Sequence, residues 1–534
     1  NASISNTTTA PIKVLDAKKV ILTLADNTTN TITDSSRLST EEDYSAAIYS
    51  KEDLIINGNG TLNVNAGYRN GIKSTDDCII VSGTLNITST EDGIIGKDLC
   101  GVVAGDININ AGSDGIKSTY DTDTTKGNVI IEGGNITIKA SNDGIQAENI
   151  LVINDGAINI KTNNGAADTT QTHIDNMDMG RGGFGFNNNK TTTTTDDTSE
   201  SRKGIKAGNM LIINDGDITI DSDDDSVHCN SVIYIYGGTI NAATGDDGVH
   251  ADDLLTVNGG TINITQCYEG IEADDIVIND GDISVVSSDD GINSSDGSIT
   301  INGGNLLINA SGDGLDANGS IIINGGYIVV LGPTSDGDTA IDYDDSCTIN
   351  GGTVMAFGSS GMLEIPKGAS NGACIVTAFT SVSGGSKYTL SDSNGNEILS
   401  YTPSKAYAAA IVYSDKITTG NTYDITAGST TLSIEVTSDV TSNVSSGLGG
   451  AGGMNKPGNG GSGMPNNGSS DNGMNGNSNG SMPDMSGNGA PDMNGNSSGD
   501  MPSMGGNSSN NSGNMPNMNN GSSNVNAPQM NNRM

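Results

Sequence analysis

Short runs in which apolar and polar residues alternate recur along most of the chain. Pairs of isoleucines two positions apart mark them, for example at Ile136 and Ile138, Ile218 and Ile220, and Ile262 and Ile264. A period of two is typical of a β-strand with one buried face, and Gly, Asn and Asp separate the runs as turn residues do. No helical periodicity accompanies them. The pattern therefore predicts an all-β protein built from short strands.

The runs return at a fixed interval, which two sequence markers show independently. The glycine of a [DE]-G-[IV] phrase is the first marker, and Ser226 takes its place once; it falls at Gly71, Gly93, Gly115, Gly144, Gly204, Ser226, Gly248, Gly270, Gly291 and Gly314. Apart from two longer steps with insertions, the steps are 21 to 23 residues, and N-[GD]-G turns keep the same interval. Two or three strands in about 22 residues form one coil of a parallel β-helix, whose neighbouring coils lie ~4.8 Å apart.

The composition divides the chain into four parts. We expect the repeat to form the β-helix over residues 41–358, with a disordered polar loop inserted at 163–201. Residues 1–40, including Ile12 to Asp34, are expected to cap one end, and residues 359–442 to form a small C-terminal β cap. Residues 443–534, rich in Gly, Asn, Ser and Met, cannot bury enough apolar surface to offset their ordering entropy, so we predict a disordered tail.

The chain is strongly acidic, with 64 Asp and Glu against 23 Lys and Arg and a net charge of −41. Such a charge disfavours nucleic acid and anionic membrane surfaces, so an acidic polymer would be held only through a bridging cation. No run approaches the ~18 apolar residues of a membrane span. The chain begins at Asn1 without Met, consistent with removal of a targeting segment. Cys78 and Cys100 share a column one coil apart, which allows either a disulfide or two stacked buried thiols.

Carboxylates crowd next to the marker glycine. Asp before Gly is ordinary turn chemistry, and Asp or Asn ladders can cap bends by local hydrogen bonds. However, like charges one coil apart repel by ~1 kcal/mol in water and more at a lower dielectric. The crowding is greatest between Asp224 and Asp290, and oxygen ligands suit Ca²⁺. We therefore hypothesise one or more calcium sites there, with candidate ligands Asp224, Asp225, Asp246, Asp247, Asp252, Glu269, Asp274, Asp289 and Asp290.

A second column lies two residues after each marker, between an apolar and a small residue. We expect its side chains to point outward; it contains Lys73, Lys117, Gln146, Lys206, His228, His250, Glu272 and Asn293. The candidate glycan-contacting residues are Lys206, His228, His250, Glu272 and Tyr268. The two histidines could instead bind zinc or simply reflect the repeat. The lysines could serve a calcium-dependent β-elimination enzyme as base, although a surface lysine beside a carboxylate is usually a solvated ion pair.

Several segments together resemble a known family. They are LADNTTNTITD (Leu24 to Asp34), INGNGTLNVNAGYRNGIKSTDD (Ile56 to Asp77), STEDGIIGKD (Ser89 to Asp98), SDGIKS (Ser113 to Ser118) and NDGIQAENILVINDG (Asn142 to Gly156). The chain is similar there to bacterial carbohydrate-binding proteins of the clostridial cellulose- and pectin-binding β-helix family (domain of unknown function 4353). The resemblance implies a secreted, right-handed parallel β-helix that binds calcium and polysaccharide. Trp is absent, so Tyr234, Tyr236, Tyr268 and Tyr327 are the plausible surfaces on which a sugar ring could stack.

Three classes of function follow from these patterns. The favoured one is a secreted, non-catalytic, calcium-dependent protein that binds acidic, pectin-like or cellulose-like polysaccharides, with no catalytic residue nominated. The alternatives are a pectate-lyase-like enzyme that uses calcium and a column lysine, and a structural or adhesive cell-surface protein.

Overall fold

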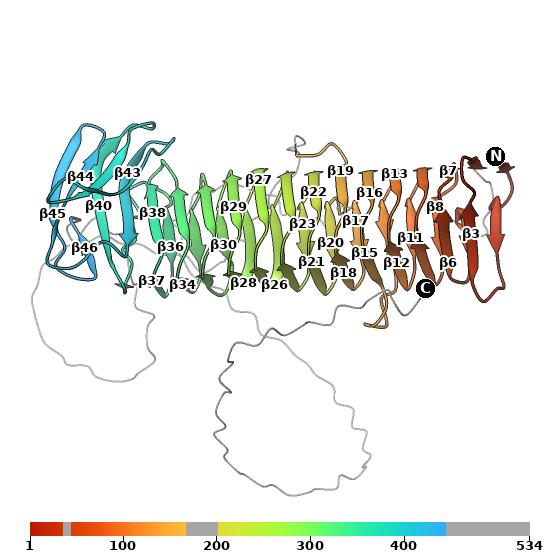
Figure 1. Ribbon diagram of the computed structural model, residues 1–534, viewed down its shortest axis with the longest axis horizontal. Helices are drawn as coiled ribbons and strands as arrows, with labels where there is room; N and C mark the ends of the chain where they lie inside the picture. The colour runs from red at the N-terminus through yellow and green to blue at the C-terminus, as the bar shows by residue number, and fades with distance from the viewer. Residues whose placement is uncertain (36–43, 167–200, 445–534) are drawn as a thin grey trace, which may run out of the picture. The chain divides into compact units, whose positions relative to one another are not determined.

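A computed structural model describes residues 1–35, 44–166 and 201–444, and it confirms the all-β prediction. Most of these residues form a parallel β-solenoid of about 13 turns, and none of them forms a helix (Figure 1). Accordingly, no helix long and apolar enough to cross a membrane occurs among them. Most of the loop (163–201) and tail (443–534) predicted to be disordered, namely residues 167–200 and 445–534, lies outside the described residues.

Two long sheets, here called sheet A and sheet B, run the length of the solenoid. The parallel strands of sheet A are β1 (Ser3–Asn6), β4 (Thr29–Asp34), β7 (Thr61–Ala66), β10 (Thr84–Ser89), β13 (Asp106–Ala111), β16 (Asn135–Ala140), β19 (Ala157–Thr162), β22 (Asp217–Ser222), β25 (Thr239–Thr244), β27 (Thr261–Cys267), β29 (Asp282–Ser287), β32 (Asn305–Asn309), β35 (Tyr327–Leu331) and β38 (Thr353–Gly358).

Each coil adds two strands to sheet B, and these fuse into one in β26 (Val249–Val257) and β28 (Ile271–Ile278). The first strands are β2 (Ile12–Val14), β5 (Ala46–Ser50), β8 (Asn70–Ser74), β11 (Ile94–Gly96), β14 (Ile116–Lys117), β17 (Ile145–Ala147), β20 (Ile205–Ala207), β23 (Val227–Cys229), β30 (Ile292–Ser294), β33 (Leu315–Ala317) and β36 (Ile341–Tyr343). The second strands are β3 (Val20–Leu24), β6 (Leu54–Gly58), β9 (Asp77–Ile80), β12 (Leu99–Val102), β15 (Asn128–Ile131), β18 (Ile150–Ile153), β21 (Met210–Ile213), β24 (Val232–Ile235), β31 (Ile299–Ile301), β34 (Ser320–Ile323), β37 (Ser346–Ile349) and β39 (Gly368–Ala369).

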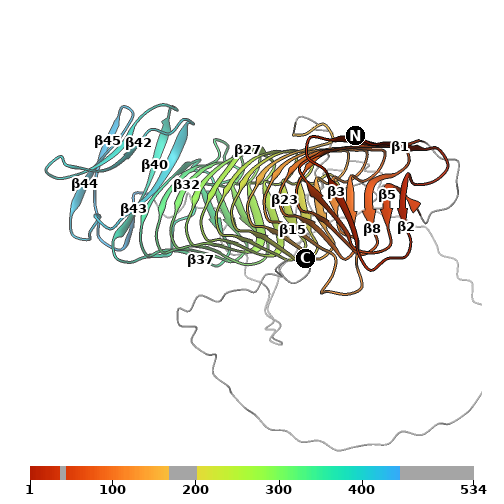
Figure 2. The same ribbon diagram turned by 45° about the vertical axis from the view of Figure 1, so that its right-hand side comes forward.

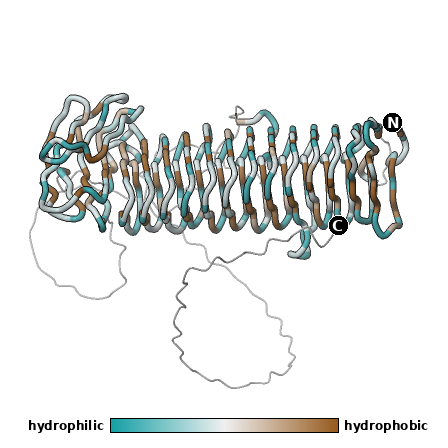
Figure 3. Tube along the Cα trace, in the orientation of Figure 1, coloured by the Kyte–Doolittle hydropathy of each residue, from teal (hydrophilic) through white to brown (hydrophobic). Residues whose placement is uncertain are grey.

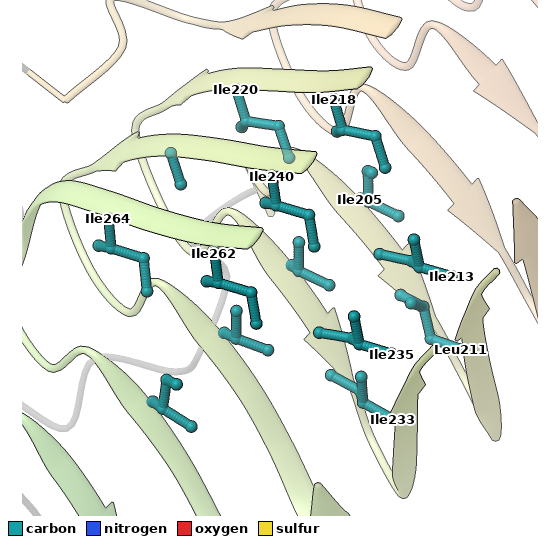
Figure 4. Close-up of a cluster of buried hydrophobic side chains, with 14 of the residues drawn as sticks. Ile205, Leu211, Ile213, Ile218, Ile220, Ile233, Ile235, Ile240, Ile262 and Ile264 are labelled. Carbon is teal, nitrogen blue, oxygen red and sulfur yellow. The ribbon is translucent and has the colours of Figure 1, made fainter. Parts of the chain in front are cut away.

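The core is a stack of identical inward positions. Ile218, Ile240 and Ile262 are direct register partners on β22, β25 and β27, and all are buried (Figure 4). Apolar and polar segments therefore recur in the same places on successive coils (Figure 3). Full burial of one such side chain contributes ~1.5–3 kcal/mol. Because the period of the sequence equals one coil, every repeat adds another layer to the same core.

At Gly93, the close approach of neighbouring coils leaves no room for a side chain at the marker position. The backbone nitrogen of Gly93 donates to the carbonyl of Asp114 on the next coil at 2.8 Å. A Cβ added at Gly93 would lie 2.5 Å from the carbonyl oxygen of Gly115 and 2.6 Å from Cγ2 of Ile109. A side chain at Gly93 would therefore displace either the backbone of the next coil or the core side chain of Ile109.

The N-[GD]-G turns have their own ladder. Their last glycine takes a left-handed conformation, as in Gly281 with φ +130°. The preceding asparagines bond from coil to coil: Asn302 Nδ2 donates to Asn279 Oδ1 at 2.8 Å, and Asn324 Nδ2 to Asn302 Oδ1 at 2.8 Å. Side-chain ladders of this kind satisfy polar groups at a bend that would otherwise face water or one another.

At the N-terminal end, the residues expected to form a cap continue the solenoid itself. β2 pairs with β5, β3 with β6 and β4 with β7, all in parallel register, so residues 12–34 form a first coil, and β1 pairs along β4. Figure 2 shows β2, β5 and β8 side by side at this end.

At the C-terminal end the parallel pattern stops after β39, which still pairs with β37, so the solenoid extends about ten residues past the expected boundary at 358. Strand β43 (Tyr407–Ser414) then pairs antiparallel with β38 and with β40 (Ala373–Val382), and β46 (Val440–Ser442) lies along β40. A separate sheet, sheet C, contains β41 (Tyr388–Asp392), β42 (Glu397–Tyr401), β44 (Thr422–Ala427) and β45 (Thr430–Glu435). A second core around Phe357, Tyr388 and Tyr407 unites these strands, which cover the edge that a solenoid would otherwise expose.

Cys78 and Cys100 are register partners on β9 and β12, as the shared column predicts. Both are buried free thiols, so the structure has the stacked-thiol alternative rather than the disulfide. Burial raises the pKa of Cys100 to about 12, which keeps this thiol protonated and unreactive.

Candidate functional site

The residues that precede the marker glycine form one continuous ladder, here called the turn column. It contains Asp92, Asp114, Asp143, Lys203, Asp225, Asp247, Glu269, Asp290 and Asp313. Its acids cap the next coil: Asp114 Oδ1 accepts from the backbone nitrogen of Asp143 at 3.0 Å, and Asp290 Oδ1 from that of Asp313 at 2.6 Å. These carboxylates therefore cap the turn of the next coil, as considered from the sequence. The capping hydrogen bond uses one of the two oxygens of each carboxylate.

A second ladder, here called the strand column, runs beside the turn column along sheet B. Register pairing places its members in the order Lys73, Ile95, Lys117, Gln146, Lys206, His228, His250, Glu272, Asn293, Asp316 and Asp342. The flanking residues are buried, for example Ile145 and Ala147 around the half-buried Gln146. The predicted inward and outward positions are thus confirmed for this column, except that Ile95 and His228 are themselves buried.

In the N-terminal half of the two columns, cations compensate the carboxylates. Lys117 Nζ lies 2.6 Å from Asp114 Oδ2. Lys203 Nζ lies 2.6 Å from Asp225 Oδ2 and 2.9 Å from Asp224 Oδ1, with little of any of these side chains exposed. Although burial alone would raise the pKa of Asp225, Lys203 and His228 hold it well below the usual value. The ammonium of Lys203 thus already lies between two residues of the predicted calcium set.

Five acids in the C-terminal half of the columns differ from these in their surroundings. In the described ranges, no Lys or Arg forms an ion pair with Glu269, Glu272, Asp290, Asp313 or Asp316. Burial is the largest cause that raises their pKa values, and neighbouring carboxylates add to it. The pKa reaches about 8 for Glu269, Glu272 and Asp290, about 9 for Asp313 and about 7 for Asp316. Ionising this row without a counter-ion is therefore costly.

One group in this half has the composition of a hard-cation site. Asp290, Asp313 and Asp316 each offer a carboxylate oxygen, and these oxygens all lie within 4.8 Å of one another. Oxygen-only donors that are partly buried and already crowded fit Ca²⁺ better than a transition metal. Of these three, only Asp290 belongs to the predicted ligand set. Asp316 was missed, although it follows Gly314 by the same two positions that place His250 after Gly248.

The other predicted ligands fall into different groups. Carboxylate oxygens of Asp224, Asp225 and Asp246 lie within 4.8 Å of one another. In a second group, one ligand atom each from Asp247, His250 and Glu272 lies within 4.8 Å of the others. Glu269 accepts a hydrogen bond from Asn293 Nδ2 at 2.8 Å, one coil further on.

Asp252, Asp274 and Asp289 join none of the clusters found among the described residues. The repeated Ala-Asp-Asp phrase does not stack residue on residue, because the pairing of β26 with β28 shifts between Ala251 and Leu254, so that Leu254 faces Asp275. Asp252 and Asp253 therefore lie at a bulge, where both are exposed. Asp274 instead accepts a hydrogen bond from Ser295 Oγ at 3.2 Å.

The predicted sugar-contacting residues are divided between the two columns and the turns. Lys206 Nζ lies 3.1 Å from Ser201 Oγ, beside the compensated half. The backbone nitrogen of Tyr268 donates to the carbonyl of Asp246 at 2.8 Å, so Tyr268 lies one residue before the turn-column residue Glu269. Tyr236 and Tyr327 are 42% and 44% exposed, and the rings of Tyr234 and Tyr236 stack with centroids 6.3 Å apart. These two exposed rings are the better candidates for stacking against a sugar.

A further carboxylate group, unforeseen from the sequence, lies near the N-terminal end. Oxygens of Asp53, Asp76 and Asp77 lie within 4.8 Å of one another. Burial and a hydrogen bond with Asp98 raise the pKa of Asp76 to about 6. In the sequence, only the adjacent pair Asp76 and Asp77 points to this group. Asp53 joins it from the preceding coil.

The fold and the two columns define a class of protein, a parallel β-helix with a carboxylate-rich face. Comparison with known sequences places it more closely: a family model described as carbohydrate-binding domain-containing protein matches residues 1–248 and 246–443, so the chain belongs to this family. A carbohydrate-binding domain-containing protein of Acetivibrio thermocellus is 39% identical over 89 residues, which are 16% of this chain and 31% of that protein. The chain thus spans about a third of that curated relative.

A solved structure also matches part of the chain. It is titled as the polysaccharide lyase-like protein from C. thermocellum, gadolinium derivative. The identity is 36%, the match covers 30% of this chain and 66% of that one, and the TM-score is 0.30.

Proposed function

We propose that this chain is a secreted, non-catalytic protein that binds acidic, pectin-like or cellulose-like polysaccharides with the help of Ca²⁺. The observation that carries the proposal is the run of carboxylates from Glu269 to Asp316, which has no Lys or Arg partner among the described residues. Membership of a carbohydrate-binding family supplies the ligand class.

Calcium would supply two things at this face. It would replace the protons that otherwise neutralise Asp290, Asp313 and Asp316, whose oxygens already converge. Calcium also accepts six to eight oxygen ligands, so ligand positions beyond those of the protein would remain for uronate carboxylates or hydroxyls of the glycan. The protein itself provides a regularly spaced row of carboxylates, because successive coils lie ~4.8 Å apart.

The direct test is co-sedimentation with insoluble polygalacturonate and with cellulose, in Ca²⁺ and in EDTA. We expect retention on polygalacturonate in Ca²⁺ and loss of at least ten-fold affinity in EDTA. A triple variant, Asp290→Asn, Asp313→Asn and Asp316→Asn, keeps the capping oxygens and should lose the calcium-dependent part. The matched control is Asp92→Asn with Asp114→Asn in the compensated half, which should bind like the parent. Equal binding in EDTA, or full binding by the triple variant, contradicts the proposal, and no retention on any glycan favours a structural or adhesive role.

A lyase is the second candidate, because burial lowers the pKa of Lys73, as a catalytic base requires. Its position argues against that role: Lys73 and Asp316 are nine coils apart in the strand column, which is ~43 Å at ~4.8 Å per coil. Lys206 lies five coils, or ~24 Å, from Asp316. Ultraviolet absorbance of unsaturated uronate on polygalacturonate with Ca²⁺ tests this, and we expect no product.

Secretion is part of the same proposal, because pectin-like and cellulose-like polymers lie outside cells. Fractionation of the native host with an antibody against this chain should find it in the medium or on the cell surface. Recovery only from the cytosol would contradict this part while leaving glycan binding testable by itself.

A further inference from the structure

Two imidazoles lie one above the other where the compensated and uncompensated halves of the columns meet. His228 and His250 are register partners on β23 and β26, and their ring centroids are 4.9 Å apart at an interplanar angle of 61°. His228 is buried, as are Asp225 and Asp247 beside the pair. The register of adjacent coils explains why the rings are neighbours, but not what surrounds their nitrogens.

The Nε2 atoms of both rings face an acceptor on the outer side. Nε2 of His228 lies 2.8 Å from Asn230 Oδ1, and Nε2 of His250 lies 3.5 Å from Asp252 Oδ1. A carbonyl or carboxylate oxygen can only accept, so the tautomer of each ring that could bind a metal ion is the one with its hydrogen on Nε2, facing these oxygens. In a neutral imidazole this leaves Nδ1 with a lone pair.

The Nδ1 atoms face inward, toward carboxylates that are also acceptors. Nδ1 of His228 lies 2.8 Å from Asp225 Oδ2. Nδ1 of His250 lies 3.0 Å from Asp247 Oδ2 and 3.2 Å from Glu272 Oε2. A single hydrogen on Nδ1 of His250 could serve only one of these two oxygens.

A metal ion resolves these contacts. We propose that His228, His250, Asp247 and Glu272, with Asp225 beside them, form a site for a borderline divalent transition metal of the Zn²⁺ class. The ligand atoms of Asp247, His250 and Glu272 lie within 4.8 Å of one another, and so do those of Asp225, His228 and His250. Nitrogen donors with carboxylates favour such a metal over Ca²⁺, which prefers oxygen alone.

The surroundings follow the pattern of a metal site. Ligating histidines usually donate their other N–H to a carbonyl or carboxylate, and Asn230 Oδ1 lies in the position to accept from Nε2 of a metal-bound His228. Lys203 already bonds Asp225 Oδ2, so the group of His250, Asp247 and Glu272 is the principal one, and His228 adjoins it beside the ring of His250. Because the ligands come from three successive coils, the ion would join coils at the boundary between the two halves of the columns.

The test uses the full chain without a histidine tag and with His173→Gln, so that the pair supplies the only imidazoles. The protein is freed of metal with a chelator and titrated with Co²⁺, whose visible d–d absorption reports bound nitrogen and oxygen ligands. We expect one equivalent of Co²⁺ to bind, Zn²⁺ to displace it, and a hundred-fold excess of Ca²⁺ to leave it in place. We also expect one equivalent of Zn²⁺ to raise the Tm of the metal-free protein.

Two variants and one control decide the assignment. His228→Gln with His250→Gln should abolish the absorption, and Glu272→Gln should weaken Co²⁺ binding at least ten-fold. Gln146→Asn, in the same column two coils before His228, should bind as the parent does. Circular dichroism and urea unfolding show whether each variant is folded. Absence of a d–d band in the parent, a band that persists in the double histidine variant, or displacement by Ca²⁺ would each overturn the proposal; none of these results depends on glycan binding.

Discussion

Asp225 Oδ1 accepts a hydrogen bond from the backbone nitrogen of Asp247, one coil further on, at 3.1 Å. The second oxygen of Asp225 bonds Lys203 and His228 instead. The carboxylate therefore ties neighbouring coils together with one atom and carries the chemistry of the face with the other. For this reason the capping and the ion-binding interpretations of the acidic columns are compatible, and they can be separated by Asp→Asn substitution, which removes the charge and keeps an acceptor.

The capping role can be measured at Asp143, which is 1% exposed. Its Oδ1 accepts from the backbone nitrogen of Lys203 and from Ser201 Oγ, both at 2.8 Å. Asp143→Ala leaves a buried N–H without a partner and should lower the free energy of unfolding by ~1–3 kcal/mol. Asp143→Asn retains the acceptor and should lose less than half as much. Urea unfolding checks both, and equal losses would show that charge rather than capping is what matters there.

Lys203 provides a test of buried charge compensation. Its side chain is 14% exposed and bonds Asp224 and Asp225. Lys203→Gln leaves these carboxylates without their cation and should cost ~3–5 kcal/mol. The matched control is Lys387→Gln, whose pair with Glu397 is about half exposed and worth ~0–1 kcal/mol.

The same variant bears on calcium. Because oxygens of Asp224, Asp225 and Asp246 lie within 4.8 Å of one another, millimolar Ca²⁺ should restore part of the Tm lost in Lys203→Gln. If Ca²⁺ raises the Tm of Lys203→Gln by no more than it raises the Tm of the parent protein, Ca²⁺ does not take the place of the Lys203 ammonium among these three carboxylates.

The sequence predicts the columns well because its period equals one coil. Cys78 and Cys100 are partners, and His228 lies beside His250, simply because each pair is 22 residues apart. The same reasoning fails where the period changes. Asp252 and Asp274 look equivalent in the sequence, but the shorter following repeat produces a register shift that separates them.

The location of the uncompensated charge could not be predicted from columns alone. Lys203 occupies a turn-column position, yet its long side chain reaches carboxylates of the next coil, so it neutralises part of the predicted calcium set. Asp316 was overlooked because it stands alone in its phrase, without a second acid beside it. Its relation to Asp290 and Asp313 depends on side-chain reach across two columns, which the repeat does not encode.

Close approach of the coils predicts the cost of a single methyl group at the marker glycine. In Gly93→Ala the new Cβ would lie 2.5 Å from a backbone oxygen that cannot move without separating two coils. We expect a loss of ~1–3 kcal/mol, as for other overpacked sites. Gly337→Ala is the control, because a Cβ there meets nothing within 4 Å and the backbone is not left-handed. Similar urea midpoints for the two variants would contradict this account of the repeat.

The raised pKa values of the uncompensated carboxylates predict how stability depends on pH without metal. The pKa of Glu269 rises from 4.5 to about 8 and that of Asp313 from 3.8 to about 9 on folding, chiefly because of burial. The folded state therefore binds more protons than the unfolded state between these limits, and its free energy of unfolding falls as pH increases from about 4 to about 9. In EDTA, the Tm should thus decrease from pH 5 to pH 8.5.

Calcium should reduce this decrease, because an ion that replaces the protons removes the cost of ionisation and binds the folded state preferentially. The triple variant Asp290→Asn, Asp313→Asn and Asp316→Asn should show a flatter profile in EDTA and little response to Ca²⁺. Differential scanning calorimetry across pH, with and without Ca²⁺, measures both effects. A Tm in EDTA that rises or stays constant over this range would mean that these carboxylates ionise freely in the fold, and the electrostatic basis for a cation at this face would be lost.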